Sequence, residues 1–92
     1  MILETPAQMA QKAAKRFRNT RKAKKVTIKA LSEKSGVPYS TIRRFESEGE
    51  ISFVAFVKLV SALNLDAEIS GLLKDPIPDS IEEVIRGNNR KN

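Results

Sequence analysis

The sequence predicts an all-α fold, and three features of the 92-residue chain lead to this prediction. Apolar residues recur at helical spacing, and no segment shows the apolar–polar alternation that is typical of a strand. Residues with capping side chains precede several of the apolar segments. Glycine and proline residues separate these segments into short helices. A single domain of this length can bury a modest helical core.

The first two helices are expected at about residues 6–22 and 28–35. Residues 5–8, with the sequence TPAQ, combine a capping box with a proline at the first helical position. Thr27 is placed to cap the second helix. Ser32 provides a small side chain where the second helix is expected to cross the third.

A glycine and a proline separate the second helix from the third. Gly36 suits the left-handed conformation that ends a helix, and Pro38 has no N–H group with which to continue one. A third helix is expected from near Tyr39 to just before Gly49. The order of helix, short turn and helix is a helix-turn-helix motif. The apolar residues expected to hold it together and onto the body are Ile28, Leu31, Val37, Ile42 and Phe45.

The remaining chain is expected to contribute two more helices to the core and a short extension. Residues 52–65 are apolar on more than one face, so this helix is central to the core or reaches a partner surface. A short fifth helix is expected around Ile69, Leu72 and Leu73. We therefore expect a domain at residues 1–74. A proline-containing linker, a short helix and a disordered basic tail are expected at residues 75–92.

The composition argues against several classes of function. The chain has no Cys and no His, so we expect no metal site and no cofactor. Most nucleophilic and acid–base mechanisms lose their usual residues for the same reason, and we expect no enzyme activity. No apolar run is long enough to span a membrane, and the first residues lack the apolar region of a signal peptide. We therefore expect a cytoplasmic protein without membrane contacts.

The positive charge of the chain is concentrated near its start. The net charge is +6, and within residues 1–29 nine basic residues against one acidic residue give +8. A basic block on a nearly neutral body indicates a polyanionic partner. A solvated helix face with spare lysines explains the charge equally well when the charge is considered alone.

The outer face of the third helix favours DNA as that partner. Arginine can donate two hydrogen bonds to guanine O6 and N7, and hydroxyl groups near a helix start can bind phosphates or base edges. Such arginines are ordinary surface residues in most helices, but within a helix-turn-helix they favour DNA contact. If Ile42 and Phe45 face the core, the residues that face outward are Tyr39, Ser40, Arg43, Arg44 and Ser47.

Residues 26–65, from VTIKALSEKSGVPYSTIRRFE to LVSALNL, resemble the Cro/CI (Xre) type of helix-turn-helix regulator. The resemblance extends over about residues 13–73. It implies a compact five-helix Cro/CI-like DNA-binding domain, which residues 75–92 would follow as a short helical extension. It also places Tyr39, Ser40 and Arg44 at positions that usually read bases.

The same resemblance implies roles for further residues, and the sequence differs from the family at two places. Arg43 is expected to join the base-reading residues, and an ion pair between Arg21 and Glu46 is expected to connect the first helix to the third. Ile28 stands where the family often has a glutamine. The acidic segment at residues 46–50, with the sequence ESEGE, stands where the family often has a basic loop. The residues expected to bind phosphates are Lys25, Thr27, Lys29, Thr41 and Ser47.

One helix-turn-helix reads only a few base pairs, so we expect a homodimer on a palindromic operator in double-stranded DNA. The expected dimer interface consists of Leu72, Leu73, Ile77, Ile81, Val84 and Ile85. The small size and the C-terminal segment are similar to antitoxins that bind HipA-like kinase toxins and repress their own operon. We therefore expect an autoregulatory repressor with a toxin partner. A phage-type or general repressor without a toxin, and a protein-interaction module in which DNA binding is secondary, stay open as alternatives.

Overall fold

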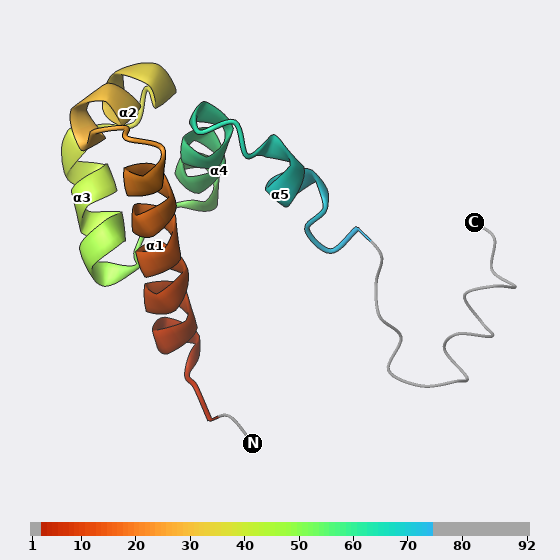
Figure 1. The fold of residues 1–92 in the computed structure, drawn as a ribbon. Coiled ribbons are helices and arrows are strands. Elements are labelled where there is room, and N and C mark those ends of the chain that lie inside the picture. Colours follow the sequence, from red (N-terminus) through yellow and green to blue (C-terminus); the bar gives the residue numbers. More distant parts are fainter. Residues whose placement is uncertain (1–2, 75–92) are drawn as a thin grey trace, which may run out of the picture.

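The computed structural model describes residues 3–74, which form five α-helices and no strand (Figure 1). The all-α prediction is confirmed for this part of the chain. The expected extension at residues 75–92 lies outside the described residues. The helices are α1 (Pro6–Ala23), α2 (Ile28–Ser35), α3 (Tyr39–Glu48), α4 (Phe53–Ala62) and α5 (Asp66–Ser70).

Side-chain caps explain where three of the helices begin. Thr5 Oγ1 accepts a hydrogen bond from the Gln8 amide at 3.1 Å, and Gln8 Oε1 accepts one from the Thr5 amide at 2.9 Å. Thr27 Oγ1 accepts from the Ala30 amide at 3.0 Å, and Ser52 caps α4 in the same way. Each cap supplies a partner that the first turn of a helix lacks, and typically contributes about 1 kcal/mol.

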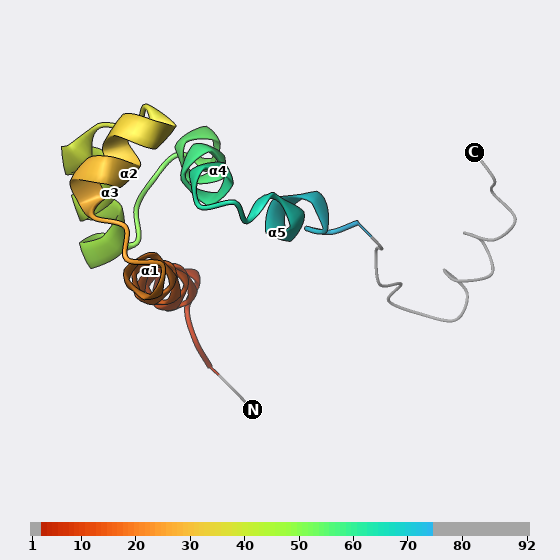
Figure 2. The same ribbon diagram turned by 45° about the horizontal axis from the view of Figure 1, so that its top comes forward.

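The first helix, α1, packs against α3. α2 packs against both α3 and α4, and α4 packs against α5. The two ribbon views place α3 on one side of α1 and place α4 and α5 on the other (Figures 1 and 2). The third helix therefore lies at one edge of the described domain, far from α5.

The core lies between α1, α2, α3 and α4. Leu31, Ile42 and Leu59 are completely buried at its centre. The rings of Phe17 and Phe45 have centroids 5.4 Å apart, and Phe56 stacks at an angle against both. Four of the five apolar residues expected to hold the helix-turn-helix are buried, whereas Ile28 is only partly buried at the edge of the core.

Two glycines adopt a left-handed backbone conformation that other residues rarely adopt. Gly36 has a φ of 80° and ends α2, as the sequence predicts. Gly49 has a φ of 79° and ends α3. A Cβ atom on Gly49 would lie 3.0 Å from the backbone nitrogen of Gln11, so the chain passes close to α1 at this point.

The structure corrects the expected ends of α4 and the position of the fifth helix. α4 ends at Ala62, before the expected end at residue 65, because Asn64 adopts a left-handed conformation with a φ of 62°. The fifth helix then begins at Asp66, where an acidic side chain is favoured by the helix dipole. Leu72 and Leu73 lie beyond its end rather than within it.

Leu59→Ala should lower the free energy of unfolding by about 2–5 kcal/mol, because it leaves a cavity at the centre of the core. Chemical denaturation measures this loss. Val54→Ala is the matched control on the same helix, because the Val54 side chain is 64% exposed. The control should change the free energy by less than about 0.5 kcal/mol, and equal losses in both variants would contradict this core.

Candidate nucleic-acid interface

Side-chain hydrogen bonds fix the turn between α2 and α3. Ser32 Oγ donates to the carbonyl oxygen of Val37 at 2.6 Å, and Ser35 Oγ accepts from the Val37 amide at 3.1 Å. The Val37 side chain is buried beneath the turn. The sequence predicts only a small side chain at Ser32, and its hydrogen bond is an additional finding. Together these contacts hold α3 at a defined angle to α2.

The side chains of α3 divide into a buried row and an exposed row. Ile42 and Phe45 are buried against the core, and Thr41 is half-buried between the two rows. Because residues three or four positions apart share a helix face, the outward row is continuous. It consists of Tyr39, Ser40, Arg43, Arg44 and Ser47, all of which are exposed.

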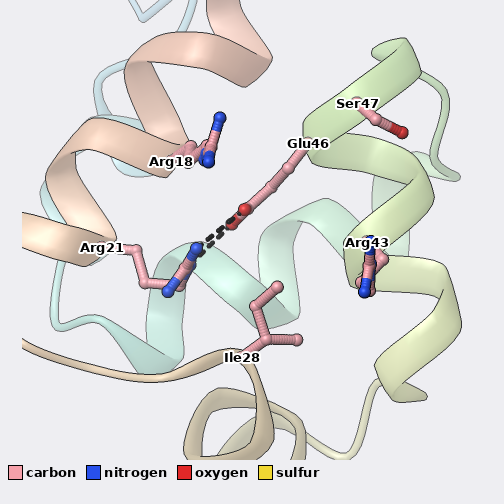
Figure 3. A pocket seen from close by; sticks show the side chains of 6 residues that line it. All are labelled: Arg18, Arg21, Ile28, Arg43, Glu46 and Ser47. Atoms are coloured by element: carbon pink, nitrogen blue, oxygen red, sulfur yellow. Dashed lines mark hydrogen bonds and ion pairs between the residues drawn. The ribbon is translucent and has the colours of Figure 1, made fainter.

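The Arg21–Glu46 ion pair connects α1 to α3 (Figure 3). Arg21 Nε donates to Glu46 Oε2 at 2.7 Å, and Arg21 Nη2 donates to Glu46 Oε1 at 2.9 Å. Arg21 Nη1 donates to the carbonyl oxygen of Val26 at 2.8 Å, in the loop before α2. The two side chains are only 8% and 6% exposed. The pair that the resemblance implies is therefore formed, and it links three segments of the chain.

A hollow of about 310 Å³ adjoins this ion pair, between α1, the start of α2 and α3. Arg21 and Glu46 neutralise each other, so the remaining charge of the hollow comes from Arg18 and Arg43, which are both exposed. Arg18 is a residue that the sequence analysis did not single out. Its position one helical turn before Arg21 places it on the same face of α1, and this spacing is the signal for it. The residues that line the hollow are Arg18, Arg21, Ile28, Arg43, Glu46 and Ser47 (Figure 3).

Arg44 is held by two carboxylates. Its Nε donates to Glu48 Oε1 at 3.2 Å, and its Nη2 donates to Glu50 Oε1 at 2.5 Å. The hydrogen bond that Arg44 donates to Glu48 and the charge of Glu50 raise the pKa of Arg44 above its ordinary value. All three side chains are more than half exposed, so the solvent screens these pairs and they contribute little to stability.

The residues expected to bind phosphates lie at three places around the motif. Lys25 is exposed in the loop before α2 and has a φ of 58°, and Lys29 is exposed in the first turn of α2. Thr27 uses its oxygen as the cap of α2, which leaves its hydroxyl hydrogen free to donate. The Ser47 hydroxyl donates to the carbonyl oxygen of Arg44 at 3.3 Å, and Thr41 lies at the edge of the exposed row.

Several exposed apolar side chains lie outside the outward row of α3. Leu72 and Leu73, two of the residues expected at a dimer interface, are 52% and 86% exposed. Phe53 and Val54 at the start of α4 are also mostly exposed, and Phe53 borders a second hollow of about 250 Å³ next to α1. The other residues expected at the interface lie outside the described residues, namely Ile77, Ile81, Val84 and Ile85.

The part of the chain that contains the helix-turn-helix motif matches a known family. Residues 17–69 fit the sequence model of the helix-turn-helix family HTH_3, and the match covers more than half of the chain. The chain belongs to this family. The resemblance to Cro/CI (Xre) regulators is thereby confirmed, and HTH_3 membership supports a DNA-binding regulator of transcription. No curated protein and no solved structure matches the chain.

Two further findings concern residues 3–74, the part of the chain that the structure describes. No group of three or more His, Cys, Asp or Glu side chains in this range is placed to hold a metal ion. No helix in the same range is both long enough and apolar enough to cross a membrane.

Glu46→Ala should lower the free energy of unfolding by about 3–5 kcal/mol, because it leaves the charge of Arg21 buried without its partner. Glu48→Ala removes an exposed carboxylate from the same helix and should leave stability nearly unchanged. Replacing both partners, as Arg21→Met with Glu46→Leu, should recover part of the loss. Chemical denaturation of the four proteins, including the wild type, measures these differences. Similar stability of Glu46→Ala and Glu48→Ala would show that the buried pair does not join α1 to α3.

Proposed function

We propose that the protein is a sequence-specific DNA-binding repressor whose α3 lies in the major groove. The observation that carries this proposal is the division of α3 into a buried row and an exposed polar row. In helix-turn-helix proteins, residues near the start of the second helix of the motif contact base edges. Tyr39 and Ser40 occupy this start, and Arg43 and Arg44 follow one turn later.

The proposed base-reading residues are Tyr39, Ser40, Arg43 and Arg44, and each offers a different contact. A guanidinium group can donate two hydrogen bonds to guanine, which is the commonest specific contact to a base. A serine hydroxyl can donate or accept and therefore suits several base edges. The ring of Tyr39 is 47% exposed at the start of α3, where it can contact a thymine methyl group.

The proposed phosphate contacts surround this reading surface, which suits a protein that must grip the backbone on both sides of the groove. They are Lys25, Thr27, Lys29, Thr41 and Ser47. The start of α2 adds the positive end of a helix dipole, which favours phosphate near Thr27. The basic residues of α1 would add attraction that does not depend on sequence.

The hollow beside the Arg21–Glu46 pair is a further candidate contact for the DNA backbone. Arg18 and Arg43 both line it, from α1 and α3 respectively. Two guanidinium groups around one concave surface suit a phosphate, because arginine donates several hydrogen bonds in a fixed plane. This placement would let Arg43 contact either a phosphate or a base next to it.

A homodimer is proposed because one motif reads only a few base pairs, whereas two copies one helical turn apart read a palindrome. The exposed apolar side chains of Leu72 and Leu73 support an interface after α5. Phe53 and Val54 offer a second apolar area at the start of α4. An interface that includes residues 77–85 would be continuous in sequence with Leu72 and Leu73.

A DNA-binding protein represses most simply by covering a promoter, and we propose that this one represses its own operon. The similarity of its size and C-terminal segment to antitoxins supports a HipA-like kinase toxin as a partner. A phage-type or general repressor without a toxin uses the same DNA-binding surface. The exposure of Phe53 and Val54 is the one observation that favours the other alternative, a protein-interaction module in which DNA binding is secondary.

Binding to the DNA upstream of the protein's own gene tests the proposed function. The full chain should bind this duplex more tightly than a scrambled duplex of equal length at about physiological salt, with two protomers per site. Gel-shift titration with a known protein concentration gives both the affinity and the stoichiometry. Equal and weak binding to the two duplexes would contradict autoregulation and favour the protein-interaction alternative.

Arg44→Ala and Lys29→Ala should weaken DNA binding in different ways. Arg44→Ala should reduce binding to the preferred duplex by about tenfold to a hundredfold with little loss on scrambled DNA, because a base contact is lost. Lys29→Ala should weaken binding to both duplexes alike and lower the slope of log affinity against log salt by about one. Titrations at several salt concentrations measure both effects.

Lys58→Ala is the matched control for Lys29→Ala. It removes the same charge from an exposed position on α4, a helix that contributes no residue to the proposed DNA surface. It should change the salt slope much less than Lys29→Ala does. A sequence-selective loss in Lys29→Ala, or unchanged selectivity in Arg44→Ala, would show that the roles of α2 and α3 are assigned wrongly.

A further inference from the structure

We propose that Glu48 and Glu50 are positioning residues that set the selectivity of Arg44 for a base over a phosphate. They hold one side of its guanidinium group and leave the other side free to donate. This inference rests on the DNA-reading role proposed above for α3. It adds two acidic residues to a site that otherwise consists of basic and hydroxyl side chains.

The hydrogen bonds of Arg44 to the two carboxylates leave N–H donors on Nη1 and Nη2 free for a contact with guanine. Glu48 Oε1 accepts from Nε, and Glu50 Oε1 accepts from Nη2. A guanidinium group has five N–H donors, so both N–H groups of Nη1 and one of Nη2 remain. Two adjacent donors on Nη1 and Nη2 are what a bidentate contact to guanine O6 and N7 requires. A long side chain that is already oriented also loses less conformational entropy when it binds.

The position of Glu48 is poorly explained by the stability of α3. Glu48 is the last residue of the helix, where the helix dipole disfavours a negative charge. A pair with arginine first and glutamate four residues later is also the less favourable orientation on a helix. The last turn of α3 contains no basic residue that would compensate. The hydrogen bond to Arg44 is the contact that accounts for the carboxylate at this position.

The two carboxylates would also oppose non-specific binding. Binding without sequence preference depends on the attraction between basic residues and phosphates. Glu48 and Glu50 place two negative charges around the one arginine they contact, so an approaching phosphate meets repulsion there. The base edge of guanine carries no net charge and meets less repulsion. Selectivity increases because the two carboxylates repel a phosphate and also orient Arg44 for its contact with a base.

The experiment compares two double variants of the full chain with the wild type. Glu48→Ala with Glu50→Ala removes both the charge and the hydrogen-bond acceptors, whereas Glu48→Gln with Glu50→Gln removes the charge and keeps an acceptor oxygen on each side chain. The two probes are the duplex that the wild-type protein enriches from a random-sequence DNA library and a scrambled duplex of the same composition. The measured quantity is the ratio of the two affinities.

The alanine variant should lower this ratio about tenfold, since a good bidentate base contact accounts for about 5- to 150-fold discrimination. Both double variants should bind the scrambled duplex more tightly than the wild type does. The glutamine variant should keep more of the ratio than the alanine variant, because its acceptors still orient Arg44. In an Arg44→Ala background, the alanine substitutions should no longer change the ratio, as expected if they act through Arg44.

Glu68→Gln on α5 is the control for removal of an acidic charge far from α3, and it should leave the ratio unchanged. If the wild type enriches no sequence, the proposed function and this inference both fail. If the wild type is selective but the alanine variant keeps or raises the ratio, only this inference fails. Equal ratios for the alanine and glutamine variants, or an unchanged effect in the Arg44→Ala background, would also overturn the positioning role.

Discussion

The arrangement of the domain depends on the ion pair between Arg21 and Glu46. Apolar contacts such as those between Phe17 and Phe45 hold α1 and α3 together and determine which face of α3 is buried. Two hydrogen bonds between a planar guanidinium and a carboxylate add a directional constraint on α3, because they have a defined geometry. The third hydrogen bond, to Val26, ties the loop before α2 to the same point. The desolvation cost of burying such a pair offsets much of its Coulombic attraction. Its main effect is therefore on the orientation of the helices and not on stability.

Under the proposed function, attraction to DNA and discrimination among sequences would reside in different parts of the molecule. The basic residues are concentrated in residues 1–29, whereas α3 and the turn after it contain three acidic and two basic side chains. Long-range attraction increases the rate of encounter and acts on any nucleic acid. The short-range contacts of α3, which is nearly neutral, would then depend on the base edges that lie against it. A reading helix with more positive charge would bind more tightly but would distinguish less between duplexes.

The sequence predicts those parts of the fold that depend on neighbouring residues. The caps at Thr5 and Thr27 and the end of α2 at Gly36 each involve contacts within a few positions, and they were predictable for this reason. The fifth helix was misplaced because the apolar residues Leu72 and Leu73 suggest a helical stripe, although the helix has already ended before them.

The candidate site was predictable to a similar extent. The exposed row on α3 follows from helical periodicity once Ile42 and Phe45 are assigned to the core. The pairing of Arg44 with Glu48 can be predicted from their spacing of four residues. The contact of Arg44 with Glu50, however, extends beyond the end of the helix. That contact depends on the left-handed backbone of Gly49, which turns the chain, and periodicity does not describe such a turn. Sequence reasoning therefore found the row but noted its acidic neighbours only as a departure from the loop that is often basic in the family.

Gly49 also constrains how the specificity of this protein can evolve. Its backbone lies so close to Gln11 that a side chain at residue 49 would push the end of α3 away from α1. None of the exposed residues of α3 takes part in that contact or in the core. Under the proposed function, mutations in the exposed row would therefore change the preferred DNA sequence while the helix keeps its place. A longer or shorter α3 would move this glycine out of register with α1, so new specificities should arise by substitution and not by insertion or deletion.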